Sequence, residues 1–466
     1  MQEAGPTVRA GRHLDADVAV AGAALALVAV AFVVGWWLNR AGVPLYAGTA
    51  PIFARWGVRV GPGTPLALLV AAAVVQYGPP LAARLPWRRL LAGTYAGAVG
   101  WIVSLALIDG WHDGLATKLD QEQEYLPEVA GVTDIPATVR GFAARIIDFQ
   151  PDSWNTHVAG HPPGALLVFV WLHRIGLGGA DWAAVVCVAA GALTAVAVPV
   201  TLRALGDEAA ARAAAPFLVL FPGAVWLGVS ADAIFAGVTA TGIALLALGA
   251  ARGGGAGTIA ALAGGALLGF GLFLSYGMTL TAPLALATAL VLGRIRPLLI
   301  GAAGTLTVVA VFAVAGFWWY DGYHLVVDRY YQGIAHERPY AYWVWANLAC
   351  LVLAAGPAAA PVLRRVLLAV RPARPPRQDP VASPRLQRVV ARARAAPVAL
   401  PLAAGIAITA ADLSGLSKAE VERIWLPFSV WLLAGAALLP GGHRRRWLIA
   451  QAVTALTVNH LLLTVW

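Results

Sequence analysis

Apolar runs of membrane-spanning length follow one another along almost the whole chain. At about 1.5 Å per residue, runs such as 18–37 and 90–108 are long enough to cross roughly 30 Å of hydrocarbon. The predicted spans are 18–37, 64–82, 90–108, 161–177, 182–202, 212–228, 232–250, 256–274, 276–293, 298–318, 342–363, 396–411, 425–440 and 447–465. The pattern predicts an all-α polytopic membrane protein with about 13 transmembrane helices.

Composition agrees with lipid as the solvent. Hydrophobic residues make up 60% of the chain, charged residues 12%, and the mean hydropathy is +0.73. The net charge is +10, but the basic residues lie in short loops between apolar runs, as expected for cytoplasmic loops, so nucleic acid is not an expected partner. Cys187 and Cys350 fall inside apolar runs and match no zinc or redox spacing.

The charge pattern also predicts sidedness. Basic clusters near 84–89, 294–296, 364–394 and 443–446 mark cytoplasmic loops, which leaves 109–160, 319–341 and 412–424 outside. Segment 161–177 would then enter and leave on the same face, so it is either re-entrant or another span is misassigned. The expected division is 1–89 as an extra pair of helices, 90–363 as the membrane core with outer loop 109–160, 364–395 as a basic Pro/Arg-rich cytoplasmic linker, and 396–466 as the C-terminal helices.

The first outer loop is long for a membrane hairpin, and a loop of this length is usually functional or disordered. Asp120, Glu122 and Glu124 form its tightest acidic cluster, just before Tyr125 and Pro127. One of them is a candidate general base for an acceptor hydroxyl; the alternative is a solvated acidic loop that caps a helix. Residues 133–149 carry an apolar stripe that predicts an amphipathic helix on the membrane surface.

The end of this loop brings two histidines to the start of the next apolar run. His157 and His161 are followed by Pro162 and Pro163. Prolines suit a first helical turn, and a helix that begins there would not carry both histidines as a metal pair. Polar capping or substrate contact is therefore expected rather than metal ligation.

The other two outer loops supply arginines where arginine is otherwise unexpected. The second loop contains Arg329, His336, Arg338 and Tyr340 among many aromatics; aromatics alone would be interfacial anchors, whereas the arginines suit phosphate. In the third loop, Ser417 and Glu420 predict a capping box. Arg423 follows, either to hold a lipid phosphate or to pair with Glu420.

Taken in order, these motifs resemble the GT-C superfamily of membrane glycosyltransferases, which includes protein O-mannosyltransferases and aminoarabinose transferases. The resemblance covers roughly residues 90 to 466. It rests on the stretches Asp120 to Tyr125, His161-Pro162-Pro163, Ser230-Ala231-Asp232, Arg338-Pro339-Tyr340 and Glu422 to Pro427. The chain departs from the pattern in its two preceding spans, in lacking a clean Asp-Glu pair, and in having no large soluble domain after the last helix.

The resemblance implies transfer of a hexosyl or pentosyl unit from a polyprenyl-phosphate donor, at the outer face of the cytoplasmic membrane, to a glycan, lipid or protein acceptor. It implies inversion at the anomeric carbon and an outer-loop carboxylate as the base. No cofactor is assigned, and the requirement for a divalent metal ion is left open. The residues expected to contact substrate are Tyr125, His157, His161, Asp232, Arg329, His336, Arg338, Tyr340, Glu420 and Arg423.

Two other functions compete with this interpretation. A transporter or lipid flippase would need ionisable residues deep inside its spans and often two similar halves. Asp232 is the main candidate of that kind, and the halves show no convincing repeat. A non-catalytic membrane scaffold is the third hypothesis, but it would need neither the long acidic loop nor the outward arginines.

Overall fold

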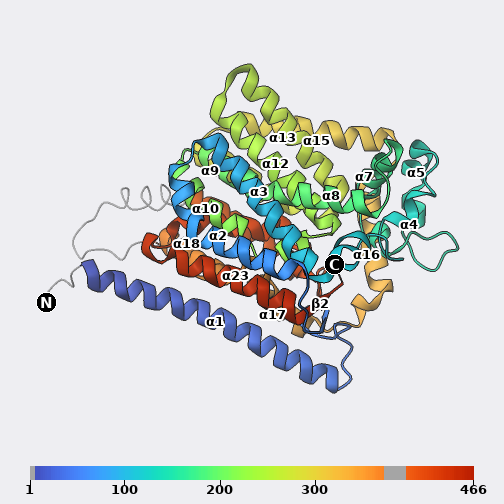
Figure 1. The fold of residues 1–466 in the computed structure, drawn as a ribbon. Coiled ribbons are helices and arrows are strands. Elements are labelled where there is room, and N and C mark those ends of the chain that lie inside the picture. Colours follow the sequence, from blue (N-terminus) through green and yellow to red (C-terminus); the bar gives the residue numbers. More distant parts are fainter. Residues whose placement is uncertain (1–5, 372–394, 466) are drawn as a thin grey trace, which may run out of the picture.

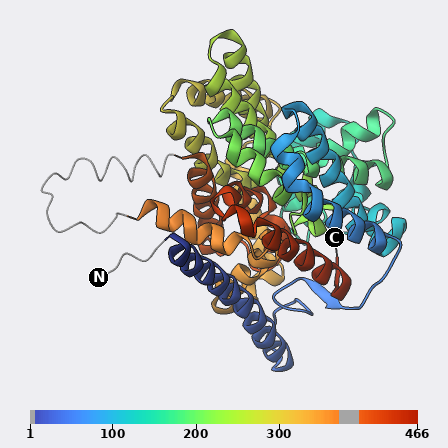
Figure 2. The same ribbon diagram turned by 60° about the vertical axis from the view of Figure 1, so that its left-hand side comes forward.

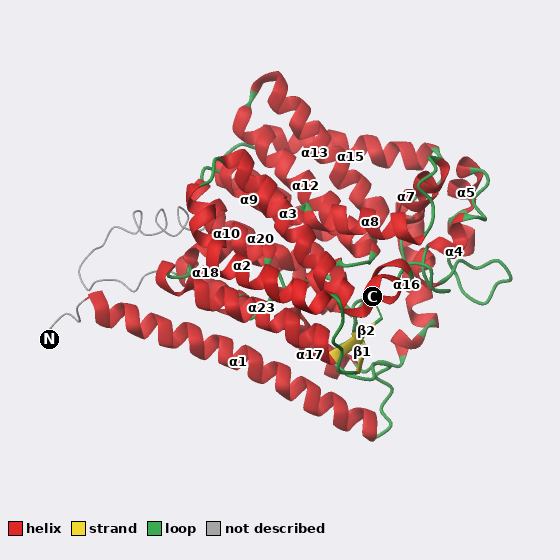
Figure 3. Cartoon of the chain, in the orientation of Figure 1, coloured by secondary structure: helices red, strands yellow, loops and turns green. Residues whose placement is uncertain are grey.

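The computed structural model describes residues 6–371 and 395–465. Within these ranges the fold is a bundle of helices with one two-stranded sheet (Figure 3). The predicted all-α architecture with apolar helices of membrane-spanning length is therefore confirmed.

Eight helices among the described residues are long and apolar enough to cross a membrane. They are α1 (Pro6–Arg40, apolar from Leu14), α2 (Gly63–Arg84), α3 (Trp87–Ala106), α8 with α9 (Ala180–Ala192 and Thr194–Ala204), α12 (Ala231–Arg252), α13 (Gly254–Leu274), α15 (Arg296–Val314) and α20 (Ala396–Leu413). A ninth is added if α17 (Tyr340–Ala355) and α18 (Ala359–Val370), which meet at 105°, form one broken span. The expected number of about thirteen spans is not confirmed.

Several predicted spans are short helices in the structure. These are α7 (Pro163–Arg174), α10 (Glu208–Val219), α14 (Ala282–Leu292), and α22 (Leu426–Ser429) with the following 3-10 helix η6 (Val430–Leu438). With 12 residues, α7 is only about 18 Å long. It is too short to cross the bilayer alone, in agreement with the parity problem at 161–177.

The remaining elements are mostly short and join the longer helices. They are η1 (Leu107–Asp109), η2 (His112–Ala116), α4 (Leu126–Val129), α5 (Ile135–Gly141), η3 (Ala143–Arg145), α6 (Thr156–Ala159), α11 (Ala224–Leu227), η4 (Tyr276–Thr281), α16 (Trp319–Gln332), η5 (Ile334–His336), α21 (Val421–Ile424), η7 (Gly441–His443), α23 (Arg444–Leu461), and the strands β1 (Ala54–Trp56) and β2 (Leu462–Thr464). Strands β1 and β2 pair antiparallel, with Arg55 opposite Leu463.

Small residues allow the central helices to approach closely. A side-chain carbon at Gly237 of α12 would lie 2.0 Å from the carbonyl oxygen of Ala190 in α8, and one at Gly265 of α13 would lie 1.8 Å from that of Gly301 in α15. Close backbone contact through glycine is the usual way in which membrane helices associate, because an apolar side chain gains little free energy when it leaves lipid for the protein interior. The packing fixes α12, which carries Asp232 at its start, among α8, α9 and α13.

Helix α1 lies along one edge of the bundle, against α17 and α18 (Figure 2). Its Asp17 is fully buried and pairs with Arg364 and Arg365 of α18 at 2.8 and 2.5 Å. The predicted linker 364–395 was therefore placed too early, since residues 364–370 are helical. Residues 372–394 of that linker lie outside the described residues.

The predicted outer loops gather at one end of the bundle. Helices α4, α5 and α16 and the sheet lie together on the right of Figure 1, and the loop after α20 joins them through an ion pair between Arg338 and Glu420. The predicted helix over 133–149 is divided into α5 and η3. Phe142 of its stripe is fully buried against Trp154 and Phe317, so the expectation of a membrane-surface helix is wrong: the stripe faces protein.

Candidate functional site: a buried centre of carboxylates and arginines

The three acids of the first loop have different environments. Asp120 and Glu122 are exposed, whereas Glu124 is 4% exposed. Glu124 stands two residues before α4, whose first turn contains Pro127 as expected. The Glu124 side chain does not cap that helix, because its carboxylate contacts His157 near the end of the same loop. Among these three acids, burial thus separates Glu124 from the other two.

His157 connects the first loop to the third. It lies on α6, whose N-terminus is capped by the side chain of Asn155, and its backbone N–H donates to the carbonyl of Gln123 at 3.0 Å. His157 Nδ1 is 2.6 Å from Oε1 of Glu124, and Nε2 is 3.3 Å from Nη2 of Arg423. A guanidinium can only donate, so Nε2 accepts in this contact and Nδ1 carries the proton that it donates to Glu124.

Arg423 is the cation at the middle of the centre. Its Nη1 donates to Asp232 at 2.6 Å and its Nη2 to Glu420 at 3.0 Å. Burial by itself lowers the pKa of Arg423, but the carboxylates of Asp232 and Glu420 outweigh burial and raise it. A buried charge needs such partners, because removal from water costs several kcal/mol. Asp232, the residue that suited a transporter, is therefore one half of an ion pair.

Glu420 lies between two arginines. Its carboxylate is 3.0 Å from Arg423 and 3.5 Å from Arg338. Burial raises its pKa, but the two arginines more than compensate, and the net shift is downward. Ala419 and Glu420 both have positive φ, 72° and 63°, a strained conformation for residues other than glycine. The predicted capping box of Ser417 and Glu420 is wrong, because the Glu420 side chain binds arginines instead of the helix N-terminus.

Tyr125 and His161 form a neutral layer next to this centre. The Tyr125 hydroxyl is 2.9 Å from Nδ1 of His161, which is also 2.7 Å from the carbonyl oxygen of His157. Burial lowers the pKa of His161 to about 4 and raises that of Tyr125, so both side chains are uncharged at neutral pH. No group of three or more His, Cys, Asp or Glu residues in the described part of the chain is arranged to hold a metal ion.

Four predicted contact residues have other partners in the structure. Arg329 pairs with Asp148 at 2.7 Å, His336 bonds the carbonyl of Gly333, and Tyr340 is 40% exposed at the bundle edge. Arg338 reaches Glu420, but its other bonds go to the carbonyls of Leu45, Tyr46 and Lys418. Arg338 therefore joins three chain segments, and the other three residues lie outside the centre.

Sequence reasoning named Glu422 only as part of a motif and did not assign it, or the segment between α1 and α2, to the site. Glu422 is fully buried, and its Oε1 accepts from the N–H of Phe53 at 3.1 Å. Burial raises the pKa of Glu422 to about 7. The acidic residue itself is visible in the third loop, but no feature of the sequence pairs it with Phe53, because residues 41–62 carry no motif that points to the site.

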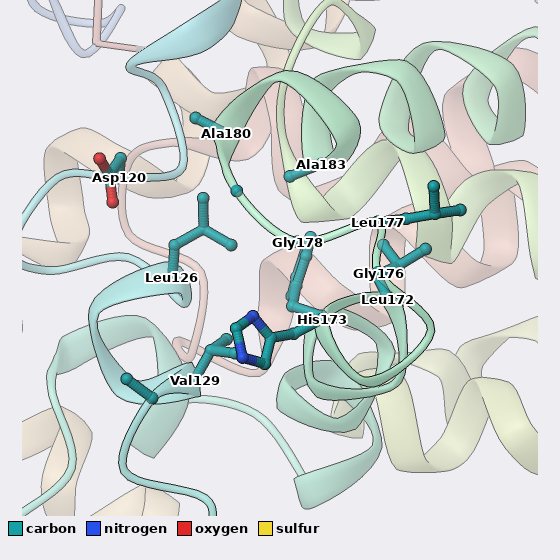
Figure 4. A pocket seen from close by; sticks show the side chains of 13 residues that line it. Asp120, Leu126, Val129, Leu172, His173, Gly176, Leu177, Gly178, Ala180 and Ala183 are labelled. Carbon is teal, nitrogen blue, oxygen red and sulfur yellow. The ribbon is translucent and has the colours of Figure 1, made fainter.

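A cavity of about 510 Å³ lies next to the centre, between α4, α7 and the start of α8. Figure 4 shows Asp120 on one side of it, near Leu126, and His173 on another, near Val129 and Leu172. The ring of Phe169, which also lines the cavity, packs on Tyr125 with centroids 5.3 Å apart. One aromatic pair therefore lies between this cavity and Glu124.

The fold and the site define the class of protein: a polytopic α-helical chain with a buried centre of three carboxylates, a histidine and two arginines at one end of its helices. No protein-family model matches the sequence, and no curated protein matches it.

Among solved structures, the chain is similar to the oligosaccharyltransferase of the archaeon Archaeoglobus fulgidus. The structure with Zn and sulfate is 15% identical over 80% of this chain and 53% of its own, with a TM-score of 0.47. The complex with an inhibitory peptide and a dolichol-phosphate is 15% identical over 80% of this chain and 51% of its own, with a TM-score of 0.37. The form tethered to an acceptor peptide is 13% identical over 79% of this chain and 54% of its own, with a TM-score of 0.42. The chain spans about half the length of that protein. TM-scores this low establish neither a common fold nor a common activity.

Proposed function

We propose that this chain is a membrane glycosyltransferase of the GT-C type. It would transfer a sugar from a polyprenyl-phosphate donor to a hydroxyl of a glycan, lipid or protein acceptor at the outer face of the cytoplasmic membrane. The observation that carries the proposal is the contact of Glu124 with His157 and of His157 with Arg423. It brings a candidate base and a candidate phosphate ligand from two distant loops into one water-poor centre.

Glu124 is the proposed base. It is the one acid of its cluster that reaches the arginines through His157, whereas Asp120 and Glu122 are exposed. The Nδ1–H of His157 occupies Oε1 of Glu124 and fixes the direction of the carboxylate, which leaves its other oxygen for an acceptor hydroxyl. His157 is thus a positioning residue.

The reaction would be a single displacement. Glu124 takes the proton of the acceptor hydroxyl while the acceptor oxygen bonds to the anomeric carbon. The bond from that carbon to the phosphate oxygen breaks, and its electron pair leaves with the polyprenyl phosphate. Attack from the side opposite to the leaving group inverts the anomeric centre.

Arg423 would stabilise the leaving phosphate. In the structure it holds Asp232 and Glu420, whose side chains are 5% and 19% exposed. A donor phosphate would compete with Glu420, the more accessible of the two, while Asp232 keeps Arg423 in place. Stabilising developing negative charge in a site of this kind is worth about 3 kcal/mol per donor.

Binding of radiolabelled polyprenyl-phosphate sugars to the protein in lipid nanodiscs tests the proposal, with unlabelled lipid as competitor. We expect one such lipid to bind specifically, Arg423→Lys to weaken binding at least tenfold, and Arg329→Lys, the matched control outside the centre, to leave it unchanged. Transfer to acceptors, with and without added Mg²⁺ or Mn²⁺, tests turnover and the metal requirement. Folded protein that binds none of these lipids would contradict the proposal and favour a transporter.

A further inference from the structure

The cavity between α4, α7 and α8 is not used by the charged centre, and its chemistry differs from that of the centre. Its walls are mainly apolar and are formed by Leu126, Val129, Phe169, Leu172 and, in the first turn of α8, Ala183. Asp120 and His173 add polar groups on different sides (Figure 4). No arginine or lysine lines it, so it offers no cation to a phosphate.

Asp120 gives this cavity its charge. Among the described residues it makes no ion pair and its carboxylate makes no hydrogen bond to another side chain. An anion in the cavity would meet an uncompensated carboxylate, and repulsion of this kind is an effective way to exclude a ligand class. A hydroxyl or an amine, in contrast, could donate to it. The volume of about 510 Å³ is within the range of small-molecule sites, about 300–1,000 Å³.

The position of the cavity relates it to the proposed reaction. Glu124, Tyr125 and Leu126 are consecutive: Glu124 belongs to the charged centre, Leu126 lines the cavity, and the Tyr125 ring packs on Phe169 between them. The part of a ligand inside the cavity would therefore be separated from Glu124 by the Tyr125–Phe169 pair, and a hydroxyl that reacts at Glu124 would have to extend past this pair. Arg423, which is proposed to bind the phosphate, lies on the Glu124 side of these rings, and the apolar walls of the cavity lie on the other side.

We infer that this cavity binds the part of the acceptor that adjoins its reacting hydroxyl, and that it takes there an uncharged or cationic hydroxyl-bearing group of sugar size and rejects anionic ones. The inference rests on the proposed function and names its acceptor class. The apolar faces of a sugar ring would lie against Leu126 and Phe169, and a hydroxyl that does not react would donate to Asp120. The donor phosphate is held elsewhere, at Arg423.

Photolabelling in nanodiscs tests the inference without turnover. The probes are a hexyl β-D-glucoside with a diazirine in its alkyl chain and the matching hexyl β-D-glucuronide, which differs by one carboxylate. We expect the glucoside to label peptides within 120–130 or 169–183, and the glucuronide to label them at least fivefold less. Ala183→Phe, which fills the cavity, should remove this labelling, whereas Val185→Phe on the exposed side of the same helix should not.

A second variant keeps the test decisive if Ala183→Phe does not fold. Asp120 is exposed, so Asp120→Asn should fold and should raise labelling by the glucuronide to the level of the glucoside. Equal labelling by both probes in the wild-type protein, or labelling that Ala183→Phe leaves intact, would overturn the inference. Because donor binding is measured separately and depends on Arg423, failure of the acceptor site and failure of the transferase proposal give different results.

Discussion

Arg423 and Asp232 form a buried ion pair of 2.6 Å between the segment that follows α20 and the start of α12. The two side chains are 9% and 5% exposed, so each depends on the other for compensation of its charge. The pair fixes the third loop to the most central helix of the bundle, and Glu420 and His157 then take their positions around the same guanidinium.

Breaking this pair should destabilise the protein strongly. Asp232→Ala leaves a buried guanidinium with one carboxylate fewer, and we expect it to lower the free energy of unfolding by about 3–5 kcal/mol. The double variant Asp232→Ala/Arg423→Ala should lose less than the sum of the single variants, because neither charge is then buried alone. Unfolding in detergent followed by circular dichroism measures this. Additive losses would mean that the two residues are not coupled.

Replacement of Glu124 should abolish transfer while sparing the donor site. Glu124→Gln keeps the shape of the side chain but removes its basicity, so we expect turnover to fall by about 10²–10⁴-fold. Binding of the polyprenyl-phosphate sugar should change little. Glu122→Gln, two positions earlier and exposed, is the matched control and should keep its rate. Full activity in Glu124→Gln would exclude Glu124 as the base.

His157 should act through its Nδ1 atom. The amide nitrogen of asparagine can occupy the place of Nδ1, whereas glutamine places its nitrogen near Nε2. We therefore expect His157→Gln to lose roughly 10–100-fold in turnover, which corresponds to a hydrogen bond to a charged group. His157→Asn should recover much of this loss. Turnover and donor affinity are measured for both variants: a loss of turnover without a loss of donor affinity indicates that His157 positions Glu124 and does not bind the donor. Equal turnover in the two variants would rule out a role for the Nδ1–H.

Glu422 should make stability depend on pH. Its pKa is about 7 in the folded protein, against 4.5 for the ordinary side chain, because burial favours the neutral acid. The folded state then binds more protons than the unfolded state between pH 4.5 and 7, so stability falls as pH rises through this window, by roughly 3 kcal/mol in total.

Glu422→Gln provides the comparison for that pH dependence. It keeps an acceptor for the N–H of Phe53 but cannot ionise. We expect its stability to exceed that of the wild-type protein at pH 7.5 and to approach it at pH 4.5, measured as the difference in thermal midpoint at each pH. A difference that does not vary with pH would show that Glu422 keeps its charge in the folded state.

Part of the fold could be predicted because it depends on local sequence. Apolar runs such as 232–250 and 256–274 specify helices by their own length and composition, and α12 and α13 match them within a few residues. The number of spans could not be predicted in this way. The run 161–177 is also predicted as a span, but the structure folds it as the 12-residue helix α7, which begins at Pro163 and ends at Arg174.

The candidate site shows the same division. The chemistry available is visible in the sequence: acids and histidines in one loop, arginines in two others, and Asp232 at the start of a helix. The sequence left Asp120, Glu122 and Glu124 equivalent, and it gave Arg329 and Arg338 the same role as Arg423. It is the fold that buries Glu124 against Nδ1 of His157 and places Arg423 where it donates to Nε2 of the same ring. The physical reason is that solvation and ion pairing depend on contacts between residues such as 232 and 423, which close packing of α12 in the bundle brings together.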